Sequence, residues 1–249
     1  MLEGLSKQTR PADEIIVGDD GSTSQTSEVV QYWIHRGLNV RHCWHEDLGF
    51  RKSIMMNQAI KLSRGDILIF LDGDCVPFPR FVDDHTQMHE ADCIHAGARI
   101  LLGKKLTTRL ESNGLDFGSF LFWVFSRLTG DINRLSPLVR LPDGAWRKAD
   151  AQNWRLLRGC NFSVSREAML AVDGYEGSLT GWGMEDSDLA VRLLNSGLVI
   201  KSLRFSAPVL HLWHPEQDRR HLENNIAHLE STRISGRVRS ISGISSLQQ

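Results

Sequence analysis

The sequence predicts an α/β fold with a mostly parallel sheet flanked by helices. Short apolar runs alternate with helical patterns and glycine-containing loops, as in βαβ units. Residues 67–71 have the composition of a strand buried on both faces, and they run directly into Asp72-Gly73-Asp74. Residues 14–17 form a second short strand, which runs into Asp19 and Asp20. Right-handed crossovers would bring the ends of both strands to one edge of the sheet, where ligands bind in such folds.

Composition describes an ordinary globular protein. The 249 residues, 41% hydrophobic and 24% charged, suit one large domain or a domain with an added subdomain. A formal net charge of −1 gives no basic field for nucleic acid. Four scattered cysteines without C-x-x-C spacing argue against a zinc site or a disulfide framework. They fit a reducing compartment, and no signal peptide or apolar run of about 18 residues is visible. We therefore expect a cytoplasmic protein.

The elements follow from these patterns. Strands are expected at residues 14–17, 38–42, 67–71, 92–102, 156–165, 198–205 and 208–212. Helices are expected at residues 1–8, 23–37, 53–63, 80–89, 166–172 and within 181–197. Residues 115–128 predict an apolar helix too short to span a membrane, either packed in the core or dipping toward lipid. From residue 215 the chain is polar and basic, and residues 235–249 are expected to fray.

Asp72 and Asp74 are the candidate metal ligands. Their hard oxygens favour magnesium or manganese, ions that bridge to substrate phosphates. His211 or His214 would add a nitrogen ligand and shift the preference toward manganese. The alternative is an ordinary Asp-Gly turn with two histidines at a strand end.

Asp19 and Asp20 have two interpretations. A carboxylate at this strand end can accept hydrogen bonds from a base or ribose, as the acidic residue of dinucleotide-binding folds does. Alternatively Asp20, Ser22 and Thr23 only supply the N-cap of the next helix.

Glu185, Asp186 and Asp188 open a predicted helix, where the macrodipole favours acids in any case. The preceding Gly181-Trp182-Gly183 calls for a different explanation. An exposed indole offers a flat face to a sugar ring, and a carboxylate beside it can act as general base toward a hydroxyl. The two glycines would let this loop close as a lid.

Taken in order, six segments resemble the family-2 glycosyltransferases, and most closely members with a galactosyltransferase-like C-terminal half. These segments read EIIVGDDGS, LGFRKSIMMNQA, GDILIFLDGDC, GCNFSVSR, DGYEGSLTGWGMEDSDL and HLWHP. The resemblance implies a single-domain, nucleotide-sugar-binding, Rossmann-like type A fold. Residues 1–102 would bind nucleotide-sugar and metal, residues 103–215 would bind the acceptor and catalyse, and residues 216–249 would form a polar helix and tail.

The same resemblance assigns roles. Asp186 would be the catalytic base and Glu185 would bind acceptor or sugar hydroxyls. Asp72, Asp74 and His214, preferred over His211, would hold Mn²⁺ or Mg²⁺. The residues implied in binding the nucleotide-sugar are Asp19, Asp20, Arg51, Asp72, Gly159, Asn161 and Trp182.

The implied reaction is metal-dependent, inverting transfer of a hexose or N-acetylhexosamine from a nucleotide-sugar, UDP being the expected nucleotide. The acceptor would be a hydroxyl of a glycan or lipid-linked glycan, as in polysaccharide or lipopolysaccharide biosynthesis. The resemblance implies no nucleic-acid partner and allows peripheral contact with the inner face of a membrane.

One departure from the family is that its first apolar strand is absent, so the chain is expected to be a fragment or a truncated gene product. Loss of that strand would leave neighbouring strand edges unpaired. Two other functions stay open on the residues alone. The first is a non-catalytic nucleotide- or sugar-binding remnant. The second is a nucleotidyltransferase, which has no evident use for the GWGMED segment.

Overall fold

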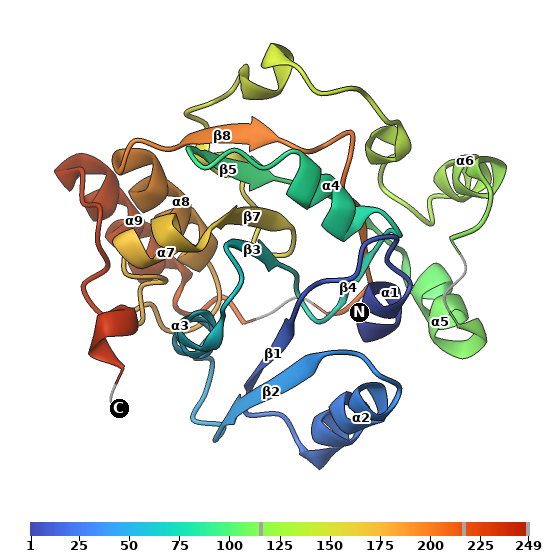
Figure 1. Ribbon diagram of the computed structural model, residues 1–249, viewed down its shortest axis with the longest axis horizontal. Helices are drawn as coiled ribbons and strands as arrows, with labels where there is room; N and C mark the ends of the chain where they lie inside the picture. Colours follow the sequence, from blue (N-terminus) through green and yellow to red (C-terminus); the bar gives the residue numbers. More distant parts are fainter. Residues whose placement is uncertain (115–116, 216–217, 248–249) are drawn as a thin grey trace. The chain divides into compact units, whose positions relative to one another are not determined.

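Figure 1 shows the computed structural model, which describes residues 1–114, 117–215 and 218–247. The chain forms two compact units. Unit 1 consists of Met1–Pro11, Ile69–Ser163 and Ile200–Glu216, and unit 2 consists of Ala12–Leu68, Val164–Val199 and Gln217–Gln249. The predicted α/β fold is confirmed. No helix in the described ranges is long and apolar enough to cross a bilayer.

Unit 2 contains the predicted βαβ unit. Strands β1 (Ile15–Asp20) and β2 (Val40–His45) pair in parallel, with Asp19 opposite Trp44 and Asp20 opposite His45. Helix α2 (Ser24–His35) makes the crossover, and α3 (Lys52–Leu62) packs on both strands. Gly18 permits this packing, because a Cβ there would lie 3.1 Å from Met55 Cγ. The strand–helix alternation therefore forms where the sequence predicted it.

The other helices of unit 2 are α7 (Arg166–Ala171), α8 (Glu185–Asn195), α9 (Leu222–Ser235) and the short 3₁₀ helix η4 (Ile244–Ser246). The expectation that residues 235–249 fray is wrong for the described part. The Asp173 carboxylate accepts hydrogen bonds from the backbone N and Oγ of Ser245, at 2.9 and 2.6 Å. Buried Glu176 accepts from the backbone N of Ile241 at 2.7 Å. Two acidic side chains thus hold the described part of the C-terminal tail.

The remaining strands form two sheets. One has the order β3 (Ile67–Phe70), β7 (Phe162–Ser165), β5 (Cys93–Ala96), β8 (Val199–Ser202). The other has the order β4 (Cys75–Pro77), β9 (Pro208–His211), β6 (Ala98–Leu101). Pairing is antiparallel for β5–β7 and β4–β9 and parallel for β6–β9.

The sheets are therefore mixed rather than mostly parallel. Parallel neighbours need a long crossover, usually a helix, between them. Such a helix separates β1 from β2, but only the short turn at Asp72–Cys75 separates β3 from β4, where Cys75 N donates to Asp72 O at 3.0 Å. The regular alternation of strands and helices, which favours parallel pairing, ends at this turn.

The helices of unit 1 are α1 (Leu2–Ser6), α4 (Phe81–Gln87), α5 (Lys104–Asn113) and α6 (Phe120–Leu128), with the 3₁₀ turns η1 (Ser136–Leu138), η2 (Ala145–Lys148) and η3 (Trp154–Leu156). One core cluster joins Val76, Ile100 and Leu210 of the sheet to Leu106 of α5 and Trp123 of α6. The predicted apolar segment 115–128 thus includes α6, while its residues 115 and 116 lie outside the described ranges. Only one side of α6 packs in the core.

Candidate active-site residues

The residues that the sequence singled out fall into two groups, one in each unit, and each group is described by itself. Asp72, Asp74, Gly159, Asn161, His211 and His214 belong to unit 1, and Asp19, Asp20, Arg51, Trp182, Glu185 and Asp186 belong to unit 2.

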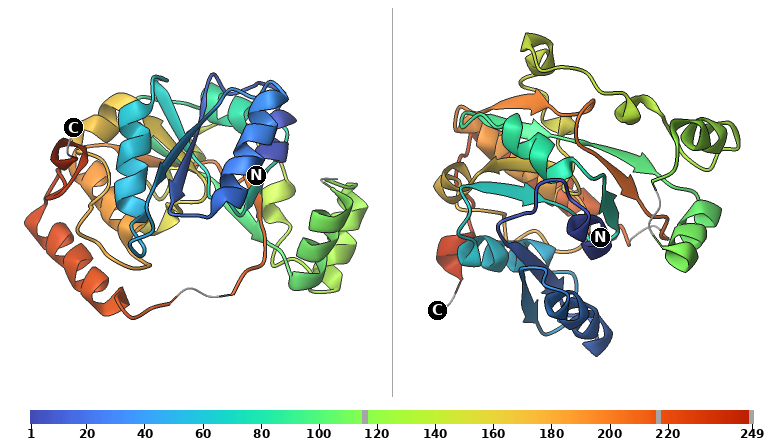
Figure 2. Two further views of the ribbon diagram at one scale, coloured as in Figure 1. Left: turned by 90° about the horizontal axis from the view of Figure 1, so that it is seen from below. Right: turned by 45° about the vertical axis from the view of Figure 1, so that its right-hand side comes forward.

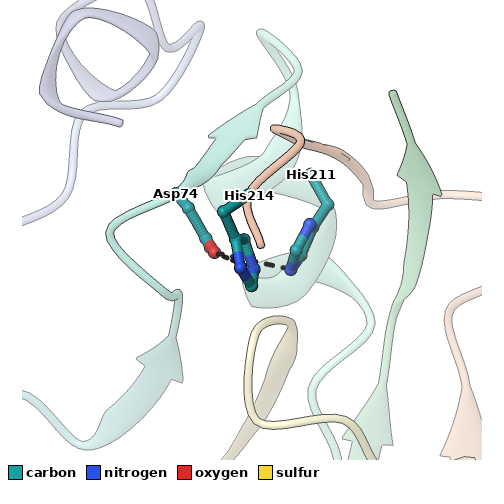
Figure 3. Close-up of side chains that lie close together, drawn as sticks. All are labelled: Asp74, His211 and His214. Carbon is teal, nitrogen blue, oxygen red and sulfur yellow. Dashed lines mark ion pairs between the residues drawn. The ribbon is translucent and has the colours of Figure 1, made fainter. Parts of the chain in front are cut away.

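The pairing of β4 with β9 brings Asp74 to the two histidines. Cys75 pairs with His211, and one residue further Leu212 N donates to Asp74 O at 2.9 Å. Figure 3 shows the side chains of Asp74, His211 and His214 converging. Asp74 Oδ2 lies 3.1 Å from Nε2 of His214 and 3.5 Å from Nε2 of His211. One ligand atom from each residue lies within 4.8 Å of the others, so a single cation can contact all three.

The backbone orients both rings. Nδ1 of His211 lies 3.0 Å from Leu212 O, and Nδ1 of His214 lies 2.7 Å from Pro215 O. A carbonyl oxygen only accepts, so each Nδ1 carries a hydrogen and each ring turns Nε2 toward Asp74. Burial lowers the pKa of His211 despite the attraction of Asp74, which favours the neutral form.

The donor set fits a divalent transition metal. Two imidazole nitrogens and a carboxylate oxygen, with each second ring nitrogen fixed by a carbonyl, are a common arrangement of metal ligands. A cation that lies between the two Nε2 atoms and the Asp74 carboxylate can contact all three residues. His211 therefore joins His214 as a candidate ligand. Asp72 is partly exposed two residues before Asp74, and its carboxylate is not part of this three-residue group.

Gly159 and Asn161 lie in the turn that leads into β7, and both are buried. The Asn161 amide donates to Ala98 O at 2.9 Å and to Ala207 O at 2.7 Å, and its oxygen lies 3.0 Å from Nε2 of His85. Gly97 must be glycine, because a Cβ there would overlap the Asn161 amide at 2.0 Å. The Asn161 side chain thus ties strands together, and its hydrogen bonds are used within the fold.

Asp19 and Asp20 lie at the end of β1, as predicted, and each meets a histidine of β2. Nε2 of His42 donates to Asp19 Oδ2 at 2.8 Å, and Nε2 of His45 donates to Asp20 Oδ1 at 2.5 Å. Burial alone would raise the pKa of Asp19, but hydrogen bonds from Ser22 and His42 outweigh it and lower that pKa. The sequence reading missed both histidines, although the parallel register with β1 places them beside the acids.

Arg51 lies next to this pair. Its backbone N donates to Asp20 Oδ2 at 2.7 Å, and its guanidinium donates to Glu46 O. The loop that the sequence placed near the nucleotide is thus bound to the acidic strand end.

The GWG loop, residues 181–184, precedes α8 in an unusual backbone conformation. Gly181, Gly183 and Met184 have φ of +71°, +111° and +72°. This region is costly for a side-chain-bearing residue such as Met184, and such strain persists only where the surroundings enforce it. The loop presents Trp182 to solvent, with the Arg219 guanidinium 5.6 Å from its ring centroid.

Glu185 and Asp186 begin α8 directly after this loop. Glu185 is buried and its Oε2 accepts from Gly183 N at 2.9 Å, whereas Asp186 is partly exposed. Burial and the adjacent Asp186 raise the pKa of Glu185, and the charge of Lys52 opposes them. Asp186 is thus the more exposed of the two residues.

Asn225 of α9, which the sequence reading missed, holds the GWG loop. Its buried amide donates to Gly183 O at 2.8 Å and to Thr180 O at 3.2 Å. A Cβ on Gly181 would lie 2.6 Å from the His221 ring, so loop and helix are in close contact. Nothing in the local sequence of a polar C-terminal helix indicates this role.

Asp188, the third acid of the cluster, serves the fold. It is fully buried, forms a 2.7 Å ion pair with Arg192 and accepts from Thr232 Oγ1 at 2.7 Å. These buried partners favour a structural role for Asp188 over a catalytic one.

Comparisons with known proteins agree on one family. The family model described as Glycosyl transferase family 2 matches residues 1–127. A second model, described as the N-terminal domain of galactosyltransferase, matches residues 149–215. Validoxylamine A glucosyltransferase from Streptomyces hygroscopicus subsp. limoneus is 29% identical over 210 residues, covering 79% of this chain and 45% of that protein. Chondroitin synthase from Escherichia coli is 22% identical over 204 residues, covering 76% of this chain and 29% of that protein.

The chain thus spans about half the length, or less, of such relatives. Among solved structures, GalNAc-T7 with UDP, GalNAc and Mn²⁺ matches with a TM-score of 0.59 at 13% identity, covering 86% of this chain and 40% of that one. TarS from S. aureus in complex with UDP-GlcNAc matches with a TM-score of 0.55 at 17% identity, covering 90% and 56%. These likenesses confirm the type A glycosyltransferase fold.

Proposed function

This chain belongs to glycosyl transferase family 2, and we propose that it moves a hexose or N-acetylhexosamine from a UDP-sugar to a glycan hydroxyl, with inversion and with a divalent metal. The observation that carries the metal dependence is the group Asp74, His211 and His214, whose ligand atoms lie within 4.8 Å of one another. The named neighbours support the donor class, since one is described with UDP and Mn²⁺ and another with UDP-GlcNAc.

Asp74 and His214 would hold the ion, with His211 as a further nitrogen ligand and Asp72 beside them. Manganese accepts this mixed oxygen and nitrogen set better than magnesium does, so we propose Mn²⁺. A bound ion would neutralise the negative charge that develops on the departing nucleoside diphosphate.

Asp19, Asp20 and Arg51 would bind the nucleotide. The pairs with His42 and His45 fix the orientation of both carboxylates, and this preorganisation lowers the cost of binding a base or ribose. Gly159 and Asn161 would shape the sugar pocket through the backbone, because the Asn161 side chain is already bonded within the fold.

Asp186 would take the proton from the acceptor hydroxyl as its oxygen attacks the anomeric carbon. The C–O bond to the sugar forms as the bond to the diphosphate breaks, which inverts the configuration at that carbon. Glu185 would hold hydroxyls near it, and the exposed Trp182 would stack on a sugar ring. A positioned general base of this kind contributes about 10²- to 10⁴-fold to the rate.

We assign donor binding and the aspartate ligands of the metal to residues 1–102, and a polar helix and tail to residues 216–249. Residues 103–215 would bind the acceptor, catalyse the transfer and add the histidine ligands. The proposed acceptor is a polysaccharide or a lipid-linked glycan, as in lipopolysaccharide synthesis, and a membrane surface would present it. Four free cysteines, three of them buried, support a reducing, cytoplasmic site of action.

The test is a screen of nucleotide-sugars for nucleoside diphosphate release, with and without Mn²⁺. The wild type should release UDP in the presence of metal and acceptor. Asp186→Asn should lower this rate by about 10²- to 10⁴-fold while UDP binding stays within about twofold. Exposed Asp218→Asn serves as the matched control. Full turnover in Asp186→Asn would contradict the assignment of the base. If the wild type binds UDP without turnover, the result favours a non-catalytic binding remnant. If it releases pyrophosphate, the result favours a nucleotidyltransferase.

A further inference from the structure

One face of α6 exposes large apolar side chains that the proposed reaction does not use. Leu121 and Leu128 are 76% and 80% exposed, and Phe120 and Phe125 are 57% and 66% exposed. At 3.6 residues per turn these four side chains span an arc of about 140° on the helix. Contiguous apolar surface of this kind on a folded protein marks an interaction site more often than chance.

The opposite face of α6 is fixed in the core of unit 1. Trp123 and Ser126 are buried, and Trp123 Nε1 donates to Phe117 O at 2.5 Å. Trp123 packs in the cluster with Leu106 of α5 and Ile100 of β6. Packing therefore holds the helix by its inner face, and the fold itself does not need the outer apolar residues.

Cationic side chains border the apolar arc. Arg127 lies next to Phe120 on the helical wheel, and the Arg109 guanidinium of α5 lies 5.4 Å from the Phe122 ring centroid beyond the other edge. Figure 2 shows α5 and α6, both in green, at the same end of unit 1. The basic residues of these two helices are Lys104, Lys105, Arg109 and Arg127, against the single acid Glu111. This local excess of positive charge contrasts with the formal net charge of −1 for the whole chain.

A tryptophan extends this surface toward the metal ligands. Trp213 is exposed, its backbone N donates to Thr107 Oγ1 of α5 at 2.9 Å, and Lys104 Nζ lies 5.1 Å from its ring centroid. The next residue is His214. Indole rings flanked by cations favour the boundary between lipid headgroups and hydrocarbon.

We propose that the outer face of α6, with the cations of α5 and Trp213, is a peripheral surface for a membrane of anionic lipid. Leu121, Phe125 and Leu128 enter the headgroup–acyl boundary, and Arg109, Arg127 and Lys104 contact lipid phosphates. An apolar arc bordered by cations is the pattern of an interfacial helix. Because Trp213 adjoins His214, this surface would bring a lipid-linked acceptor near the metal ligands. That last consequence rests on the proposed function, whereas lipid binding itself does not.

The experiment is co-sedimentation of the full chain with vesicles of phosphatidylcholine alone or mixed with phosphatidylglycerol. The wild type should partition onto the mixed vesicles, and less so at high salt. The double variant Leu121→Asp/Leu128→Asp should lose at least tenfold in partitioning. Ile234→Asp on α9 is the matched control, since Ile234 is 86% exposed on a helix outside this surface. Arg109→Glu/Arg127→Glu should remove the preference for phosphatidylglycerol, and exposed Lys61→Glu on α3 should keep it.

Circular dichroism would verify that each variant is folded. Equal partitioning of wild type and Leu121→Asp/Leu128→Asp would overturn the proposal, as would failure of the folded wild type to bind mixed vesicles. A wild-type dimer in ultracentrifugation that this double variant converts to a monomer would also overturn it, because a second copy would then cover the face. Turnover is not measured, so these outcomes are independent of the proposed glycosyl transfer.

Discussion

Asp74 Oδ2 lies 3.1 Å from Nε2 of His214, on a ring whose Nδ1 is held by the carbonyl of Pro215. This ring therefore directs its Nε2 at a carboxylate instead of at solvent. His211 repeats the arrangement at 3.5 Å, with Leu212 O as the partner of its Nδ1. Two residues far away in the sequence thus complete a ligand set around an aspartate that follows a strand.

Replacing His214 by alanine should weaken Mn²⁺ binding at least tenfold, because it removes one nitrogen from this set. Changes even to the partners of metal ligands typically cost about 10- to 100-fold in affinity. Isothermal titration calorimetry with MnCl₂ measures the dissociation constant. His35→Ala, on the exposed end of α2, should leave it unchanged. An unaltered dissociation constant in both His214→Ala and Asp74→Asn would show that no metal binds here.

Asn225→Ala should loosen the GWG loop. The variant loses two hydrogen bonds, to Gly183 O and Thr180 O, each worth about 1 kcal/mol. Hydrogen exchange of a peptide spanning residues 179–186 should then be faster by about tenfold, with a lower transfer rate where turnover is measurable. The neighbouring and exposed Asn224→Ala is the control. Unchanged exchange in Asn225→Ala would show that α9 does not hold the loop.

Asp188→Ala should destabilise the fold by about 3–5 kcal/mol, because it leaves the fully buried Arg192 without its ionic partner. Chemical denaturation gives the free energy of unfolding. The exposed pair Glu230 and Arg233 on α9 supplies the comparison, and Glu230→Ala should cost less than about 1 kcal/mol. Similar losses in the two variants would be inconsistent with a structural role for buried Asp188.

Two buried histidines predict acid sensitivity. Burial lowers the pKa of His85 to about 4, and burial together with nearby positive groups lowers that of His95 to about 3. An unfolded histidine has a pKa near 6.5. Between about pH 6.5 and pH 4 the unfolded chain therefore binds protons that the folded chain does not, so stability falls as pH falls.

Each of these histidines contributes at most about 1.4 kcal/mol per pH unit to the slope of the unfolding free energy against pH. His95→Gln should reduce this slope by about that amount, whatever its effect on absolute stability. Urea denaturation at several pH values measures the slope, with exposed His35→Gln as the control. Identical slopes in wild type and His95→Gln would show that His95 does not cause the loss of stability at low pH.

Local pattern was enough to predict the first third of the fold. The strands before Asp19 and Asp72 and the helices between them follow from apolar runs and glycine boundaries, which depend on neighbours in the sequence. The same patterns failed where pairing is non-local. The mixed sheets were not predicted, because no local signal tells β5 to pair antiparallel with β7.

For this protein, the sequence by itself determined the α/β class, the acids at the strand ends and the GWG loop before Glu185 and Asp186. The tertiary structure alone decided that both His211 and His214 face Asp74 and that Asn225 holds Gly183. It also decided that Asn161 is bonded within the core and that one face of α6 stays exposed. The physical reason is that a side chain's partners depend on which distant strands and helices pack beside it. The periodicity of apolar residues indicates which side chains share one face of a helix or strand, but it does not indicate which other element that face contacts.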